Sequence, residues 1–370
     1  MGQKIISKYM QEAVSLAEKS IPFAYPNPAV GAVITNNNKI VGRGRTSHYG
    51  GAHAELNAIR SVKQKKLLAG AILYTTLEPC SHIGKTPPCI DAIIKSGIRK
   101  VIVGIIDPDQ NVSGSGLKAL KQAGIIIKTG DGSAVVKSQL RPYIYNRTYQ
   151  LPFITAKLAA SIDGKIATSS GDSQWISNNK SRSIVHQMRK KVDAVLVGSE
   201  TVIKDNPYLT ARYGKKLYKN QPLRIAIDSS GKIPINSNIF NKDAKTLIVT
   251  TTASPEKWRS AIKKKGHECI ILPKKSNKVD LDKCAESLHN LGIIHVLVEG
   301  GGKLIGELIK HKLVSMINVF YAPIIIGDKN AVNMIDGLKL NHINEALELS
   351  ELSYQLVDKD ISITAAIKYH

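Results

Sequence analysis

The sequence predicts two α/β domains in one chain of 370 residues. This length is roughly two to three times that of a typical domain. Short apolar stretches with strand character alternate with amphipathic stretches at helical spacing, a pattern typical of α/β layers. The alternation ends near residues 146–152 and starts again directly afterwards. We therefore expect one domain over residues 1–148 and a second over residues 149–370.

The composition narrows the class of protein. Apolar residues make up 43% of the chain, which is enough for hydrophobic cores and excludes a wholly disordered protein. No apolar stretch approaches the roughly 18 residues of a transmembrane helix, and the N-terminus lacks the pattern of a secretory signal. Four cysteines are too few for a disulfide scaffold. We expect a cytoplasmic protein that does not bind membranes.

The net charge of +23 indicates either an anionic small ligand or nucleic acid. Residues 1–148 hold 20 Lys and Arg against 8 Asp and Glu, and the remaining residues hold 32 against 21, so neither half is the basic one. Lys outnumbers Arg by 41 to 11, whereas recognition of bases and phosphates favours Arg. A generally lysine-rich composition explains the charge best, and we expect no nucleic-acid partner.

The elements of the first domain follow from periodicity and turn residues. The stretch 21–28 contains three prolines and is expected to be a loop rather than a helix. The stretches 70–75 and 100–106 are nearly all apolar, as in strands buried on both faces of a parallel sheet. Helices are expected over residues 5–19, 52–63, 88–96, 117–123 and 133–145, and strands over 29–35, 39–44, 70–75, 100–106 and 125–128.

The second domain is expected to be mixed α/β with an antiparallel edge, because its last apolar stretches follow one another without long helices. Strands are expected over residues 153–161, 192–198, 223–228, 245–250, 268–272 and 294–299, and then over 314–326 and 361–369. Helices are expected over residues 178–191, 255–265, 280–291 and 303–311.

The strongest chemical signal is a set of metal-ligating residues in the first domain. His53 and Glu55 are followed by Pro-Cys pairs that end at Cys80 and Cys89. A catalytic zinc takes three protein ligands and one water, and His-x-Glu followed by Pro-Cys is the signature of zinc deaminases. The sequence therefore predicts His53, Cys80 and Cys89 as ligands of one Zn²⁺ per chain and Glu55 as the residue that moves protons.

Two other interpretations of this set stay open. The zinc could be structural, with a fourth ligand from His48 or His82, or the cysteines could be free thiols in a core. Cys269 and Cys284 lie in ordinary apolar or helical patterns, and we expect them to be core thiols.

Two glycine-rich stretches compete as nucleotide-binding sites. Gly-Ser-Gly-Leu-Lys-Ala at residues 114–119 matches a loose dinucleotide pattern but does not directly follow its strand, so we interpret it as a turn and helix start. Glu-Gly-Gly-Gly-Lys at residues 299–303 runs from an apolar strand into a helix. Glycines allow a diphosphate to approach the backbone, and the helix N-terminus offers free amides, so this loop is the better candidate.

Longer motifs in both halves carry a resemblance to a known family. The first half contains Asn27-Pro-Ala-Val-Gly31, His53-Ala-Glu55 and, at residues 78–89, Glu-Pro-Cys-Ser-His-Ile-Gly-Lys-Thr-Pro-Pro-Cys. The second half contains the motifs Lys-Leu-Ala-Ala-Ser-Ile-Asp-Gly-Lys at 157–165, Gly-Asp-Ser-Gln-Trp-Ile at 171–176, Asp-Asn-Pro-x-Leu-Thr at 205–210 and Val-Glu-Gly-Gly-Gly at 298–302. Over roughly residues 5–368 the chain resembles the bifunctional deaminase/reductases of riboflavin biosynthesis.

The resemblance implies a fold and a reaction for each domain. It implies an N-terminal cytidine-deaminase-like α/β/α sandwich that deaminates 2,5-diamino-6-ribosylamino-4(3H)-pyrimidinone 5′-phosphate. It also implies a C-terminal dihydrofolate-reductase-like domain that uses NADPH to reduce the ribosyl group to ribityl. In the deaminase domain it implies Asn27, His82 and Lys85 as substrate contacts.

The resemblance also assigns residues of the reductase domain. The implied cofactor contacts are Ala159, Trp175, Thr201, Asp205, Gly301, Gly302, Lys303, Leu304, Ile305, Gly306 and Glu307. The implied substrate contacts are Ser173, Arg189, Leu209, Arg212 and Glu299. A pair of guanidinium groups from Arg189 and Arg212 suits a ribose phosphate. The sequence names no general acid for the reduction, and it allows a homo-oligomer without specifying one.

Two positions depart from the family pattern. Thr46 stands where the family often has a histidine, and the sequence has His48 two residues later. Asp107-Pro-Asp109-Gln110 replaces the common Asp-Pro-Asn-Pro, which removes an amide donor and adds a negative charge near a phosphorylated substrate. A nucleic-acid deaminase with an appended domain would explain the charge but not the second half. A non-enzymatic zinc module would leave Glu55 without a role.

Overall fold

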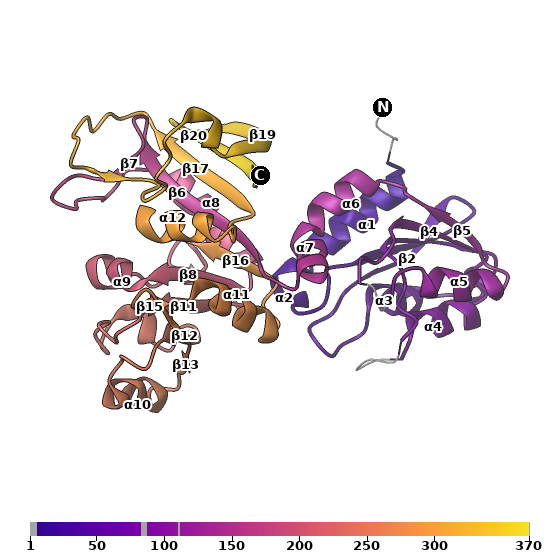
Figure 1. Ribbon diagram of the computed structural model, residues 1–370. Helices are drawn as coiled ribbons and strands as arrows, with labels where there is room; N and C mark the ends of the chain where they lie inside the picture. Colours follow the sequence, from indigo (N-terminus) through magenta and orange to yellow (C-terminus); the bar gives the residue numbers. More distant parts are fainter. Residues whose placement is uncertain (1–5, 83–86, 110–111, 370) are drawn as a thin grey trace. The chain divides into compact units, whose positions relative to one another are not determined.

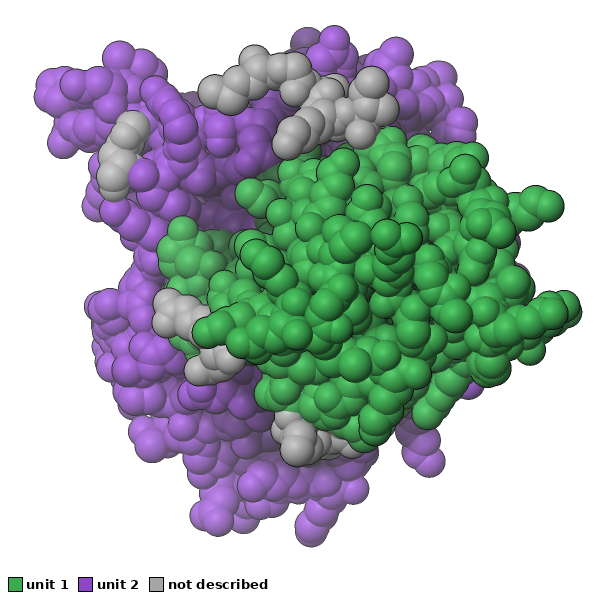
Figure 2. Space-filling model, turned by 90° about the vertical axis from the view of Figure 1, so that its right-hand side faces the viewer, with its two compact units in different colours: residues 1–151 green, residues 152–370 purple. Residues whose placement is uncertain are grey.

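The computed structural model describes residues 6–82, 87–109 and 112–369, and it divides into two compact units. Unit 1 comprises Met1–Leu151 and unit 2 comprises Pro152–His370, coloured green and purple in Figure 2. Among the described residues, no helix is long and apolar enough to cross a membrane. Each unit has a sheet and a hydrophobic core of its own.

Unit 1 is built on a five-stranded sheet with the order β2-β1-β3-β4-β5. Its strands are β1 (Gly31–Asn36), β2 (Lys39–Arg45), β3 (Ile72–Leu77), β4 (Lys100–Ile105) and β5 (Ile126–Thr129). β1 is antiparallel to β2 and β3, whereas β3, β4 and β5 are parallel. Val33, Leu73 and Val101 on the inner strands have no exposed surface. The expectation of parallel strands buried on both faces is confirmed for β3 and β4.

Helices cover both faces of this sheet, as Figure 1 shows. One face carries α1 (Lys8–Glu18) and α6 (Ser133–Gln139), and the other carries α3 (Ala54–Ser61), α4 (Cys89–Lys95) and α5 (Ser115–Gln122). A glycine lets α3 approach the sheet closely: a Cβ atom at Gly44 on β2 would lie 2.1 Å from the carbonyl oxygen of Ala54, where α3 begins. The predicted α/β/α sandwich is confirmed, and this contact fixes the start of α3 against the sheet.

Two local expectations for unit 1 are wrong. Part of the proline-rich stretch forms the short helix α2 (Ile21–Ala24), because Pro22 stands in the first turn, where no helical N–H is needed. The stretch expected as one helix over 133–145 is two helices, α6 and α7 (Arg141–Tyr149), which meet at Leu140. Pro142 lies in the first turn of α7, since inside a continuous helix it would remove a hydrogen bond. A 3-10 turn over Lys65–Leu68 completes the unit.

Unit 2 is built on a nine-stranded sheet with the order β13-β12-β11-β8-β16-β6-β17-β20-β19. Its strands are β6 (Phe153–Ser161), β8 (Ala194–Gly198), β11 (Leu223–Ile227), β12 (Thr246–Thr250), β13 (Glu268–Ile271), β16 (His295–Val298), β17 (Met316–Ala322), β19 (Glu348–Val357) and β20 (Asp360–Lys368). The strands from β13 to β17 pair in parallel, and β20 and β19 add antiparallel pairs. The expected antiparallel edge is therefore confirmed.

The remaining elements of unit 2 are helices and short two-stranded ribbons. The helices are α8 (Asn179–Lys191), α9 (Ser199–Asp205), α10 (Glu256–Lys264), α11 (Leu281–Asn290) and α12 (Gly302–Lys310), with 3-10 turns at Asn238–Phe240 and Ile343–Glu345. The ribbons pair β7 (Lys165–Ala167) with β18 (Val332–Asn333), β9 (Arg212–Tyr213) with β10 (Lys216–Leu217), and β14 (Lys274–Lys275) with β15 (Lys278–Val279).

Three features of unit 2 differ from the expectations. The strand expected over 314–326 ends at Ala322. Neither α9 nor the edge strand β19 was expected from the sequence. Nearly every residue of β19 is exposed or half-buried, so its sequence lacks the alternating apolar pattern that marks a strand with one buried face. An edge strand without a buried face is held mainly by its ladder of hydrogen bonds to β20.

The topology brings three loops to one edge of the large sheet. β8, β16 and β6 are neighbours and parallel, so their carboxyl ends meet there. In open α/β sheets, ligands bind outside the carboxyl ends of the strands. These ends lead into α9 after Gly198, into residues 299–301 after Val298, and into residues 162–164 after Ser161.

Candidate active sites

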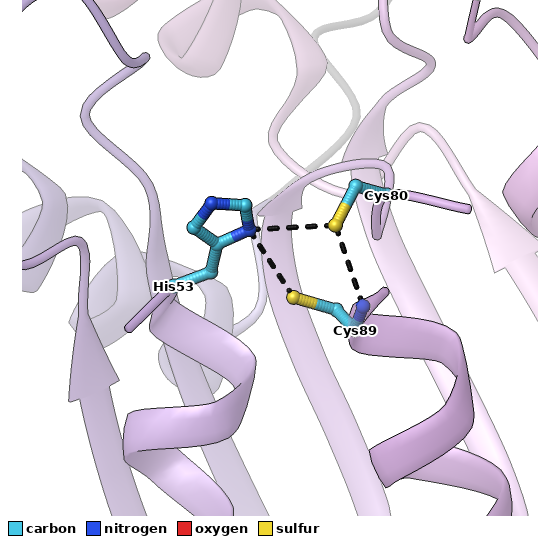
Figure 3. A group of neighbouring side chains, drawn as sticks. All are labelled: His53, Cys80 and Cys89. Atoms are coloured by element: carbon cyan, nitrogen blue, oxygen red, sulfur yellow. Dashed lines mark hydrogen bonds between the residues drawn. The ribbon is translucent and has the colours of Figure 1, made fainter. Parts of the chain in front are cut away.

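A three-residue centre lies in unit 1 where two helices begin. His53 is the N-cap of α3, and Cys89 is the first residue of α4. The Nδ1 atom of His53 lies 3.4 Å from Cys80 Sγ and 3.3 Å from Cys89 Sγ, as Figure 3 shows. A tetrahedral zinc with one nitrogen and two sulfur ligands separates N and S by about 3.5 Å. The three predicted ligands therefore converge with the spacing that zinc requires.

The donor set fits a catalytic rather than a structural zinc. Within the described chain, the group that could hold a metal consists of His53, Cys80 and Cys89. His48 packs instead on the ring of Phe23, 4.5 Å between centroids, and His82 is exposed. Neither histidine joins the group, so a tetrahedral ion held here would keep one position for water.

The two thiols differ in their affinity for a proton. A hydrogen bond from the Cys89 thiol lowers the pKa of Cys80 to about 4, and the same hydrogen bond, together with burial, raises the pKa of Cys89. The backbone N–H of Cys89, at the start of α4, also donates to Cys80 Sγ at 3.3 Å. The hydrogen bond with Cys80 raises the pKa of His53. Cys80 is thus the thiol that gives up its proton more readily, and metal binding to both cysteines would release thiol protons.

Glu55 lies beside this centre without belonging to the metal-ligating group. It is in the first turn of α3, is 4% exposed, and accepts a hydrogen bond from Thr75 Oγ1 at 3.2 Å. Burial raises its pKa above the usual 4.5, and the charge of Cys80 acts in the same direction. A carboxyl group with a raised pKa in a cavity is suited to take up and return a proton.

A cavity of about 470 Å³ joins the predicted deaminase residues. Asn27, His53, Glu55, Cys80 and His82 all line it. Lys85, the remaining predicted substrate contact, lies outside the described residues. The structure therefore brings the described candidates to one cavity large enough for a small-molecule ligand.

The departure at Thr46 has a structural explanation. Thr46 is buried at the wall of the cavity. Its hydroxyl donates to the carbonyl oxygen of Pro28 at 3.0 Å and accepts from the N–H of Val30 at 2.9 Å. Thr46 thus holds the backbone that follows Asn27, a positioning role that does not need a histidine.

Glu78 is a supporting residue that the sequence reasoning missed. Its carboxylate accepts hydrogen bonds from the N–H groups of Asp107, Gly114, Gly116 and Leu117 at 3.0–3.2 Å. It thereby ties the loop before Cys80 to the start of α5. A charged residue directly after the end of an apolar strand was the available signal. The interpretation of residues 114–119 as a turn and helix start is confirmed, since Gly114 is the N-cap of α5.

In unit 2, a buried ion pair joins two predicted substrate contacts. Arg189 on α8 donates from Nε to Glu299 Oε1 at 2.6 Å and from Nη2 to Oε2 at 2.9 Å. Its Nη1 donates to the carbonyl oxygen of Thr210 at 3.0 Å. The side chains of Arg189 and Glu299 are 13% and 9% exposed. Burial by itself would raise the pKa of Glu299, but the charge and hydrogen bonds of Arg189, together with the charge of Lys157, outweigh burial and lower the pKa.

Lys157 is a second residue whose role was not predicted from the sequence. It lies on β6, and burial lowers its pKa, an effect that the charge of Glu299 opposes and that of Arg189 reinforces. A lysine within a strand is unremarkable in sequence. Its placement beside a carboxylate and a guanidinium follows only from the pairing of β6 with β16.

Other predicted reductase residues lie on either side of α8 in the chain. Leu209 is 3% exposed and directly precedes Thr210, and Arg212 begins β9. The Nε atom of Arg212 is buried without a hydrogen-bond partner among the described residues, and its guanidinium lies 5.7 Å from the Tyr208 ring. Ser173 and Trp175 precede α8, where the guanidinium of Arg182 lies 4.5 Å from the Trp175 ring. The substrate-contact roles stay predictions.

The predicted cofactor loop lies at the start of α12. Gly301 is the N-cap, and a Cβ atom there would meet nothing within 4 Å, so the backbone is open to a ligand. A Cβ at Gly302 would lie 2.2 Å from the carbonyl oxygen of Asn333, and one at Gly306 would lie 1.8 Å from that of Asp336. These two glycines let α12 pack against residues 333–336. The loop therefore fits a diphosphate at Gly301, with Thr201 and Asp205 on α9 at the same sheet edge.

The remaining cofactor candidates are Ala159, which lies outside α12, and four residues of α12. Ala159 lies on β6, opposite Phe320 of β17. Lys303, Leu304, Ile305 and Glu307 follow in the first two turns of α12. Ile305 is fully buried and Leu304 packs towards Gly198 and Gly300, so these two support the loop from within the unit.

Fold and site together define the class. Unit 1 is an α/β/α sandwich with a three-ligand centre and an adjacent buried glutamate, which is the arrangement of a zinc-dependent hydrolytic deaminase. Unit 2 is a mixed α/β unit with a nucleotide-type glycine loop. Two family models match these units: the cytidine and deoxycytidylate deaminase zinc-binding region over residues 3–105, and the RibD C-terminal domain over residues 152–363.

Whole-chain relatives give the particular family. The riboflavin biosynthesis protein RibD of Chlamydia pneumoniae is 38% identical over 96% of this chain and 94% of its own length. That of Aquifex aeolicus is 37% identical over 98% and 99%. The chain belongs to the RibD family, the bifunctional deaminase/reductases of riboflavin biosynthesis.

Solved structures agree along the whole chain. RibD of Acinetobacter baumannii has a TM-score of 0.87 at 28% identity and covers 98% of both chains. A diaminohydroxyphosphoribosylaminopyrimidine deaminase/5-amino-6-(5-phosphoribosylamino)uracil reductase of Thermotoga maritima has a TM-score of 0.84 at 34% identity, covering 97% of this chain and 98% of its own. The two predicted domain folds and the two enzyme activities are thereby confirmed.

Proposed function

We propose that unit 1 deaminates 2,5-diamino-6-ribosylamino-4(3H)-pyrimidinone 5′-phosphate and that unit 2 reduces the ribosyl group of the product to ribityl with NADPH. The observation that carries the proposal is the convergence of His53, Cys80 and Cys89 beside buried Glu55 in one cavity. The name of the Thermotoga maritima relative supports the same pair of substrates. A cytoplasmic location and a homo-oligomer stay predictions.

In the deaminase site, Glu55 is the proton carrier. Zinc, when bound to His53, Cys80 and Cys89, supplies a water that ionises near neutral pH. Glu55 takes the proton of the attacking water, delivers it to the ring nitrogen, and then assists the departure of ammonia. Its raised pKa suits a group that must both accept and release a proton. Asn27 and His82 contact the pyrimidine from the cavity wall.

In the reductase site, the protein binds and orients the substrate and supplies a proton to it. NADPH, when bound at residues 301–307, supplies a hydride. As the new C–H bond forms at the ribose carbon, the bond from that carbon to the ring oxygen breaks, and the oxygen needs a proton. Lys157 is the candidate donor, because burial lowers its pKa and so favours release of its proton. Glu299 and Arg189 fix its position electrostatically, and Arg212 contacts the substrate phosphate.

Two assays on the purified chain test the proposal. We expect ammonia release from the diamino compound, oxidation of NADPH when the deaminated compound is supplied, and about one zinc per chain by metal analysis. We expect kcat/KM to be at least about tenfold higher for NADPH than for NADH, because a charge-assisted contact to the 2′-phosphate is lost with NADH. Ammonia release from RNA but not from the pyrimidine would contradict the proposed deaminase substrate. Equal kcat/KM with NADPH and NADH would contradict the proposed cofactor preference.

A further inference from the structure

The deaminase cavity is acidic for a site that receives a phosphorylated substrate. Among its described lining residues, Glu55, Glu78, Asp107 and Asp109 are acids. Arg147 is the one arginine or lysine in the same described lining. Glu78 is engaged by backbone amides and Asp107 accepts from the Tyr143 hydroxyl, so these carboxylates are held in the cavity wall and keep it acidic. A phosphate group entering this cavity needs a cation, and Arg147 is the described side chain that supplies one.

Arg147 is held at the cavity wall without using all its donors. It lies on α7, and its Nε atom is 3.7 Å from Asp109 Oδ2, which is longer than a hydrogen bond. That Nε atom is buried and makes no hydrogen bond to a described residue. The side chains of Arg147 and Asp109 are 30% and 25% exposed. The guanidinium is thus attracted to Asp109, and it remains partly exposed at the cavity wall.

Tyr143, one turn earlier on α7, fixes the guanidinium from a second side. The Arg147 guanidinium lies 5.2 Å from the centre of the Tyr143 ring, within the range of a cation–π contact. The Tyr143 hydroxyl donates to Asp107 Oδ1 at 3.1 Å. Asp107 and Asp109 therefore hold α7 against the cavity through Tyr143 and Arg147, and they orient the arginine before any substrate binds.

This arrangement also accounts for the departure at Asp109. An asparagine at this position, as in the common family pattern, would offer an N–H donor and no charge. The Asp109 side chain, by contrast, has no N–H donor and adds a negative charge that would repel a phosphate. A cation at Arg147 offsets the added negative charge and brings back donor capacity at the same wall of the cavity.

We propose that Arg147 is a substrate-binding residue of the deaminase site, that it contacts the phosphate of the pyrimidine nucleotide, and that Asp109 and Tyr143 position its guanidinium. This inference rests on the proposed function, since it takes the phosphorylated pyrimidine as the ligand. It assigns α7 to the substrate site, to which no motif in the sequence had assigned it.

The first test compares the phosphorylated substrate with the riboside that lacks the phosphate. Arg147→Met removes the charge and keeps a long apolar side chain. We expect KM for ammonia release from the phosphorylated compound to rise about tenfold to a hundredfold, with kcat within about twofold. We expect KM for the riboside to stay unchanged. Lys137→Met, on an exposed position of α6, is the matched control and should alter neither substrate.

A second variant separates phosphate binding from simple neutralisation of Asp109. If Arg147 served only to offset that charge, Asp109→Asn would restore the Arg147→Met enzyme, and the proposal would be overturned. We expect instead that the double variant still fails to prefer the phosphorylated compound over the riboside. Equal KM increases for both compounds in Arg147→Met would also overturn the proposal.

Folding and turnover are controlled separately. NADPH oxidation and thermal unfolding of the same preparation report whether Arg147→Met folds, and Arg147→Lys, which keeps the charge, should lose less affinity. If the wild-type chain released no ammonia from the phosphorylated compound, the proposed function would fail. Equilibrium binding of that compound to the wild-type and Arg147→Met chains would still test the contact, because binding needs no turnover.

Discussion

Each candidate site contains a largely buried glutamate, Glu55 in unit 1 and Glu299 in unit 2, and the surroundings shift the pKa values of these two residues in opposite directions. Glu55 has no described cationic side chain bonded to it, and burial raises its pKa. Glu299 is held bidentately by Arg189, whose charge lowers the pKa against the effect of burial. The same residue type therefore suits proton transfer in unit 1 and a fixed negative charge in unit 2. Burial alone therefore does not determine the role of a glutamate. The presence or absence of a cationic partner does.

The largest expected effect removes the metal from unit 1. Cys80→Ser exchanges a thiol whose pKa is lowered to about 4 for a serine hydroxyl. The serine hydroxyl stays protonated. We expect loss of zinc by metal analysis and a fall in ammonia release larger than the about 10²–10⁴-fold that loss of a general base costs. Hydride transfer should continue. Cys269→Ser, a half-buried thiol on β13, is the control and should keep zinc and both activities. Full zinc in Cys80→Ser would refute the ligand assignment.

A corresponding change in unit 2 should act through stability. Glu299→Gln leaves Arg189 and Lys157 without their carboxylate, and breaking a buried ion pair from one side costs about 3–5 kcal/mol of unfolding free energy. We expect a lower unfolding temperature for unit 2 and loss of NADPH oxidation, with ammonia release retained. Glu286→Gln breaks an exposed pair with Lys283 on α11 and should leave unfolding unchanged. Equal effects of the two variants would mean that burial of the first pair is unimportant.

A smaller effect is expected at the phosphate contact of unit 2. Arg212→Ala removes a guanidinium whose buried Nε lacks a described partner. We expect KM for the reductase substrate to rise about tenfold to a hundredfold, because a charge-assisted contact is lost, while ammonia release stays normal. Lys216→Ala on the neighbouring strand β10 removes an exposed charge and serves as the control. An unchanged KM in Arg212→Ala would remove this residue from the site.

The opposite pKa shifts also predict different pH profiles. Glu55 must be ionised to accept a proton, and its pKa lies above 4.5, so ammonia release should fall as the pH drops through that raised value. The pKa of Glu299 lies below 4.5, so its charge, and the hydride transfer that needs it, should persist to lower pH. Profiles of kcat/KM for the two reactions measure this. An acid limb shared by both reactions would contradict the comparison.

The metal centre could be predicted from sequence because its chemistry is local. His53 and Glu55 share one helix start, and the prolines before Cys80 and Cys89 mark the ends of a strand and the beginning of a helix. Short-range backbone rules suffice to bring such residues together once the sheet forms. The alternation of strands and helices predicted the two α/β folds for the same reason.

The rest depended on pairing across the fold. Lys157 meets Glu299 because β6 pairs with β16, and Arg147 meets Asp109 because α7 packs over the cavity. Neither of these two proximities can be inferred from the spacing of the residues along the sequence. Glu78 is similar, since its four amide donors lie 29 to 39 residues further along the chain. The edge strand β19 was missed because its exposed faces leave no hydrophobic period.

The central claim is that the two chemistries are separable, and Glu55→Gln tests it most directly. The glutamine keeps the shape of the side chain but cannot take a proton. Ammonia formed from the diamino compound and NADPH oxidised with the deaminated compound are measured on the same preparation. We expect ammonia release to fall about 10²–10⁴-fold with zinc retained, and hydride transfer to stay at the wild-type rate. Loss of both activities in a chain that still binds zinc would contradict the division of labour between the units.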